Sequence, residues 1–175
     1  MKQFWRITYE LLLLFFCISC INENMSETED VILVGSKLPN FKVEMNDGTV
    51  VTGQDLRDTT SLIMFFHTGC PDCRKALPCV QRMYNEYASR GVAFVLISRE
   101  EEEASIVTYW EEQGLDMPYS AQSDRKVYEL FAHRRVPRIY ISEPGGTVRY
   151  IFTDDPVPDV ADLAKALEQT LSLSK

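Results

Sequence analysis

The sequence lacks both a basic excess and a long apolar run. Its 18 lysines and arginines are outnumbered by 26 aspartates and glutamates, which gives a formal charge of −8 at pH 7. This balance excludes nucleic acid as a partner, because phosphate binding requires a basic face. The apolar run at residues 11–18 is too short for a transmembrane helix, which needs about 20 apolar residues.

The N-terminal residues have the layout of a secretory signal. Lys2 and Arg6 precede the apolar run, and small residues follow it. A charged start, a short apolar core and a small-residue end are typical of a signal peptide that is removed on export. We therefore predict a signal peptide over residues 1–19.

The end of this segment resembles a bacterial lipobox, in which the chain is cut before a cysteine that carries lipid. Small Ser19 precedes Cys20, although Cys17 stands where the lipobox has leucine. The resemblance implies lipidation of Cys20, and a plain cleaved signal is the alternative. We expect a lipid-anchored flexible tether over residues 20–33 and a folded domain over 34–175.

The three remaining cysteines do not form a structural framework. Outside the cytoplasm, paired cysteines are usually structural disulfides, and long loops gain most from closure. Cys70, Cys73 and Cys79 are odd in number and lie within ten residues of one another. At least one thiol therefore lacks a partner within the chain, and we interpret Cys79 as a buried small hydrophobe.

The domain alternates between strands and helices. Alternating residues around Asn46-Asp47-Gly48 predict a β-hairpin, and the apolar runs 62–66 and 92–97 predict strands covered on both faces. Strands are also predicted at 138–142 and 148–152, and a last amphipathic helix has inward Val160, Leu163, Leu167 and Leu171. The order of β-hairpin, βαβ, helical insertion, ββ and α predicts an α/β fold with a central mixed sheet flanked by helices.

The helical insertion begins with four successive acids, residues 100–103. We interpret these carboxylates as a solvated face that complements the helix macrodipole. Ile106, Val107 and Trp110 have the spacing of an inner face. The next predicted helix is capped by Asp124 and has three inward residues, Val127, Leu130 and Phe131.

The motif Cys-Pro-Asp-Cys at residues 70–73 joins a buried strand to a predicted helix. Two intervening residues on a first helical turn bring the sulfurs close enough to form a disulfide. Cys70 lies where free backbone N–H groups and the helix dipole stabilise a thiolate, the nucleophile in disulfide exchange. Pro71 suits the first helical position, and we expect it to belong to the substrate-binding surface beside Cys70. We expect Cys70 to attack the disulfide of a substrate and Cys73 to resolve the resulting mixed disulfide. The redox-active disulfide of this pair would need no further cofactor.

Zinc binding and a static disulfide are the alternative interpretations of this motif. A structural zinc site takes four ligands. Only His67, His133 and Cys79 are left to complete such a set, and Cys79 is expected inside the helix. We therefore predict no metal site.

Val136 and Pro137 immediately precede the predicted strand 138–142. Proline is tolerated at the first residue of a strand and on edge strands, so this proline can have a purely structural role. Together with the cysteine motif, this pair resembles the cis-proline loop that faces the active site in thioredoxin-like proteins. A substrate peptide would then pair with the backbone of Val136. The basic residues 133–135 either form a solvated helix end or favour the binding of acidic partners.

From about residue 35 to 171 the chain resembles the TlpA/ResA-like branch of thioredoxin-fold proteins. The hairpin, the cysteine motif, Pro78, the helical insertion and Val136-Pro137 carry this resemblance. It implies a thioredoxin-like fold and an exported, membrane-anchored thiol–disulfide oxidoreductase in the cell envelope or periplasm. The resemblance implies two kinds of partner. One is an exported protein that contains disulfides, and the other is an electron donor in the membrane.

The motif departs from this family at two positions. Gly69 replaces an aromatic residue, which makes the substrate-binding surface around Cys70 less apolar, and Ala76 replaces an acid that assists proton transfer. Asp72 either substitutes for that acid or satisfies backbone N–H groups at the helix start. His67 either tunes Cys70 or packs against the loop.

Two other functions remain open from the sequence. A thioredoxin-fold peroxidase carries threonine three residues before its reactive cysteine, where this chain has His67. A non-catalytic copper carrier would use the soft thiolates for Cu(I), with His133 as the only distant additional ligand.

Overall fold

A five-stranded mixed sheet forms the centre of the molecule. The structure is a computed structural model that describes residues 30–173. The strand order is β5-β4-β3-β6-β7. The central strand β3 (Ser61–Phe66) pairs in parallel with β4 (Ala93–Ser98) and antiparallel with β6 (Arg138–Ser142). The short β5 (Tyr119–Ser120) and β7 (Val148–Phe152) form the two edges.

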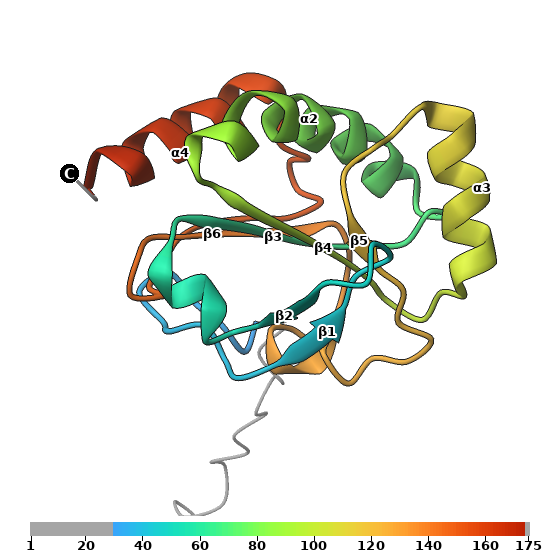
Figure 1. Cartoon of the computed structure of the whole chain (residues 1–175), viewed down its shortest axis with the longest axis horizontal. Coiled ribbons are helices and arrows are strands. Elements are labelled where there is room, and N and C mark those ends of the chain that lie inside the picture. The colour runs from blue at the N-terminus through green and yellow to red at the C-terminus, as the bar shows by residue number, and fades with distance from the viewer. Residues whose placement is uncertain (1–29, 174–175) are drawn as a thin grey trace, which may run out of the picture.

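Helices cover one face of this sheet and a hairpin covers the other (Figure 1). The helices are α2 (Pro71–Tyr87) and α4 (Val160–Leu173), with α3 (Glu103–Gln113) at the side near β5. The hairpin consists of β1 (Lys42–Glu44) and β2 (Val50–Thr52), paired antiparallel. Three 3-10 helices complete the fold: η1 (Asp55–Asp58), η2 (Ala88–Arg90) and η3 (Tyr128–Leu130). Because both faces are covered, every residue of β3 is buried, and the predicted α/β architecture is confirmed.

Two predicted inner faces were wrong in part. In α3, Val107 is 38% exposed and Tyr109 lies inside with Ile106 and Trp110. Leu130 is 39% exposed, because its segment forms the single 3-10 turn η3 rather than a helix with a continuous apolar face.

The folded domain extends further toward the N-terminus than predicted. Ile32 is buried, and the backbone N–H groups of Val31 and Ile32 donate to the carbonyl of Phe131. Residues 30–33, which the sequence assigned to the tether, are therefore part of the domain. The expected signal and Cys20 lie outside the described residues. None of the helices in the described part has the length and apolar character needed to cross a bilayer.

Candidate active site

The two cysteines of the motif lie at the start of α2, in different environments. Cys70 is the N-cap residue, with extended backbone angles, and it is partly exposed. Pro71 is exposed at the first helical position, where its missing N–H leaves no hydrogen bond unmade. Cys73 lies one turn further along and has no exposed surface. A partner can therefore reach Cys70 directly, whereas Cys73 is accessible only to Cys70.

Burial holds the buried thiol in its protonated form. Desolvation raises the pKa of Cys73 well above the ordinary thiol value. The sulfur of Cys70 raises this pKa further through charge and a hydrogen bond, while the cation of Arg99 acts in the opposite direction. Cys73 is therefore a proton donor toward the sulfur of Cys70 in the reduced pair.

The peptide bond between Val136 and Pro137 is cis, as the resemblance to thioredoxin-like proteins implied. The carbonyl oxygen of Val136 lies 3.3 Å from Sγ of Cys70, which donates a hydrogen bond to it. The structure thus brings together two segments that are 66 residues apart in the sequence. Cys70 and the backbone of Val136 share one surface, on which a peptide could contact both.

A shallow depression of about 430 Å³ opens beside Cys70. Its lining comes from four separate segments of the chain: His67, Gly69, Cys70, Asp72, Arg99, Arg135, Val136 and Asp154. Arg99 and Asp154 were not predicted, because they follow β4 and β7 and no local sequence pattern marks them. Of the basic residues 133–135, all are exposed, and only Arg135 is part of this lining.

The ring of His67 explains why glycine precedes the first cysteine. Nδ1 of His67 accepts a hydrogen bond from the backbone N–H of Gly69 at 2.9 Å. A Cβ atom at position 69 would lie 3.1 Å from this ring. Since the histidine occupies the space beside the loop, a side chain at position 69 would have to displace it. His67 therefore packs against the loop that leads to Cys70.

Asp72 does not act as a cap for the helix start. Its carboxylate instead pairs with the ammonium of Lys75 at 2.8 Å, one turn along α2. This partner raises the pKa of Lys75. The interpretation of Asp72 as a cap was wrong, because the lysine competes for the same carboxylate.

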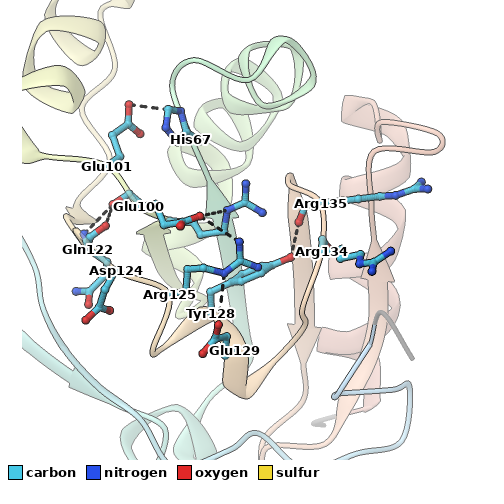
Figure 2. A network of polar contacts seen from close by, with 12 residues as sticks. His67, Glu100, Glu101, Gln122, Asp124, Arg125, Tyr128, Glu129, Arg134 and Arg135 are labelled. Atoms are coloured by element: carbon cyan, nitrogen blue, oxygen red, sulfur yellow. Dashed lines mark hydrogen bonds and ion pairs between the residues drawn. The ribbon is translucent and has the colours of Figure 1, made fainter. Parts of the chain in front are cut away.

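Glu101 is buried, so the predicted solvated face was wrong at this position. It is 6% exposed, and its carboxyl group accepts hydrogen bonds from the backbone N–H of Thr68, at 2.9 Å, and from the hydroxyl of Thr68. Figure 2 shows it beside His67, with 3.8 Å between Oε1 and Nδ1. The carboxyl group of Glu101 thus holds the loop before Cys70. No sequence pattern distinguishes Glu101 from the other acids at residues 100–103.

Cys79 is only half-buried, and its Sγ lies 3.6 Å from the carbonyl oxygen of Lys75. It is therefore less deeply placed than predicted. Within residues 30–173, no group of three or more histidines, cysteines and acids is placed to hold a metal ion.

Comparison with known proteins finds a matching family model and relatives that are named thiol-disulfide oxidoreductases. The model of the AhpC/TSA family matches residues 34–151. The thiol-disulfide oxidoreductase ResA of Bacillus subtilis is 26% identical, with 71% of this chain and 70% of the relative covered. ResA of Oceanobacillus iheyensis is also 26% identical, with 84% and 79% covered.

Solved structures of thioredoxin-family proteins share the fold of this chain. A thiol:disulfide interchange protein of the thioredoxin family from Chlorobium tepidum superposes with a TM-score of 0.68 at 22% identity, covering 80% of this chain and 99% of that one. The thioredoxin domain of a thiol-disulfide oxidoreductase from Bacteroides vulgatus gives a TM-score of 0.68 at 23% identity, covering 79% and 97%. The thioredoxin-like fold is therefore confirmed.

Proposed function

The chain belongs to the AhpC/TSA family and is a thiol–disulfide oxidoreductase of the ResA kind, and from this premise we propose that it reduces disulfide bonds in other exported proteins through Cys70 and Cys73. One observation carries the proposal. Cys70 is partly exposed, its Sγ lies 3.3 Å from the carbonyl oxygen of Val136, and Cys73 is buried one helical turn behind it. A nucleophile, a peptide-binding backbone and a resolving thiol are thus adjacent.

The cycle transfers two electrons to the substrate. The thiolate of Cys70 attacks one sulfur of a substrate disulfide; a bond to Cys70 forms, the substrate S–S bond breaks, and the second substrate sulfur leaves as a thiolate. Cys73 gives its proton to the substrate thiolate and attacks Sγ of Cys70. The bond between Cys70 and the substrate breaks, the Cys70–Cys73 disulfide forms, and the substrate takes up its second proton from solvent and leaves as a dithiol. A membrane dithiol donor then reduces the protein disulfide by the same steps in reverse.

Peroxide reduction and copper carriage are not favoured as functions. The relatives are named for thiol–disulfide exchange, and position 67 holds histidine rather than the threonine of the peroxidases. The two cysteines occupy one helical turn, which suits formation of an internal disulfide better than reaction with peroxide.

The division of labour within the motif is tested with serine variants. We expect Cys70→Ser to abolish catalysis of insulin reduction by dithiothreitol, so that only the uncatalysed rate remains, because the accessible nucleophile is lost. Cys73→Ser should accumulate mixed disulfides at Cys70, which a gel without reductant detects. Cys79→Ser is the matched control and should retain turnover. Continued turnover by Cys70→Ser would contradict the assignment.

Membrane attachment through Cys20 is the second part of the proposal. The apolar run followed by Ser19-Cys20 supports it. One acyl chain binds a bilayer only marginally, so stable attachment needs more than one. We expect the protein from its native host to begin at Cys20 and to carry several acyl groups, as measured by intact mass. An unmodified mature N-terminus would contradict the anchor and leave the redox cycle unaffected.

A further inference from the structure

A buried arginine lies beneath the segment that precedes the cis-proline bond. Arg138 is the first residue of β6, and only 1% of it is exposed. Its Nε–H donates to the carbonyl oxygen of Arg134 at 2.9 Å, and its Nη1 pairs with the carboxylate of Asp30. Arginine remains charged in a protein interior, so its burial depends on such partners.

A buried tyrosine contacts the same segment from a second direction. Tyr128 is 1% exposed, and its hydroxyl lies within hydrogen-bond distance of the carbonyl oxygens of Arg134 and Arg135. Figure 2 shows this hydroxyl pointing at the backbone while the side chains of both arginines extend away from it. Internal donors thus bind two successive carbonyls of the segment.

The backbone at Arg135 has an unusual conformation that fits this arrangement. Its φ of +66° is in the left-handed region, which residues other than glycine adopt uncommonly. The next carbonyl along the chain, that of Val136, contacts Sγ of Cys70 rather than the interior. The direction of the Val136 backbone therefore follows from how residues 134 and 135 are bound.

We propose that Arg138 and Tyr128 are positioning residues, which fix residues 134–135 from the interior so that Val136 presents its backbone to a bound peptide beside Cys70. This inference rests on the proposed function. Neither side chain touches the reacting sulfurs in this scheme. Their effect is on peptide binding, and a disulfide compound without a peptide backbone should not respond to it.

The test compares two substrates in the full-length protein. The first is a disulfide-bonded peptide, and the second is 5,5′-dithiobis(2-nitrobenzoate), which has no backbone to pair with Val136. In Tyr128→Phe we expect KM for the peptide to rise about fivefold, the effect of one lost hydrogen bond, with kcat unchanged. The rate constant with the small disulfide should stay as in the wild type.

Two further variants sharpen the comparison. Arg138→Lys keeps a cation near Asp30 but lacks the planar fork of donors, so we expect the same selective rise in KM. Tyr87→Phe is the matched control, because Tyr87 is as buried as Tyr128 and its hydroxyl donates to Glu168 on α4, at 3.1 Å. Its KM for the peptide should not change.

The outcomes separate this inference from the proposed function. If wild-type protein fails to reduce the peptide, both are overturned. If it does so but folded Tyr128→Phe keeps the wild-type KM, only the positioning role is overturned. An equal loss with both substrates, or the same rise in KM in Tyr87→Phe, would show a general structural effect and would also overturn it.

Discussion

At the scale of single residues, burial separates the two cysteines by function. Cys70 is partly exposed at the helix start, whereas Cys73 has no exposed surface and is desolvated in its charged form. The raised pKa of Cys73 keeps this thiol protonated at neutral pH, so we expect the first attack on a substrate to come from Cys70. The order of the two sulfurs in the cycle therefore has a physical basis in the fold.

The buried thiol should make the reduced protein sensitive to alkaline pH. A group with a raised pKa in the folded state keeps its proton where the unfolded chain has lost it. The stability that Cys73 contributes is therefore complete below the ordinary thiol pKa of 9.0 and is lost as the pH rises above it. We expect a loss of about 1.4 kcal/mol per pH unit in this range, measured by urea unfolding of reduced protein.

The control for this prediction is Cys73→Ala, which removes the titrating group. Tyr128 and Tyr140 also have pKa values raised by burial, and their contribution is common to both proteins. The difference between the two pH profiles therefore isolates Cys73. Parallel profiles between pH 8 and 10 would contradict the prediction.

At the scale of elements, the connection between β4 and α3 supports the loop before Cys70. Glu101 comes from this connection and accepts two hydrogen bonds from Thr68. In Glu101→Ala both accepting oxygens are lost, and the backbone N–H and hydroxyl of buried Thr68 lose these partners. We expect the free energy of unfolding to fall by about 1–3 kcal/mol, measured by urea unfolding.

Glu102→Ala provides the matched control, because Glu102 is the next residue and is exposed. Its stability should stay within about 0.5 kcal/mol of the wild type. Equal effects of the two substitutions would mean that the carboxyl group of Glu101 does not hold the loop.

Elements with a strong local pattern were predictable from the sequence. The predicted strands 138–142 and 148–152 have the bounds of β6 and β7, since apolar runs there are separated by a turn with two glycines. The two-residue β5 is too short to show a period. In α3, Val107 and Tyr109 both fit helical spacing around Ile106, so only packing decides which one lies inside.

The candidate site divides in the same way. Cys70, Cys73 and Pro137 belong to local motifs and could be proposed from the sequence, whereas Arg99 and Arg138 gave no local signal. Their roles depend on segments that meet only in the folded chain, such as the pairing of Arg138 with Asp30, 108 residues away. A single sequence carries no record of such contacts.

At the scale of the whole molecule, the direction of electron flow depends on how strongly the fold stabilises reduced Cys70. A strong oxidant stabilises its thiolate to a large extent. Here the carboxylate of Asp72 within the motif pairs with Lys75 at 2.8 Å, and no lysine or arginine directly precedes Cys70. Without such an added cation beside the nucleophile, we expect a reductase, in agreement with our proposal.

We therefore expect a reduction potential of about −270 mV, the value of thioredoxin, from equilibrium titration of the Cys70–Cys73 pair in dithiothreitol buffers. Cys79→Ser protein serves as the control that the third thiol does not contribute. A potential of about −120 mV, typical of a strong oxidant, would reverse the direction and leave the oxidoreductase assignment in place.

If Cys20 carries lipid, the pairing of Asp30 with Arg138 would also limit how far the catalytic centre can work from a membrane. It fixes the start of the described chain beneath the segment that leads to Val136. Asp30 is ten positions after Cys20, and at about 3.5 Å per residue this stretch spans at most about 35 Å. If Cys20 holds the lipid, the reach of the enzyme is comparable to the thickness of one bilayer. Its disulfide partners must then expose their target bonds close to that same surface.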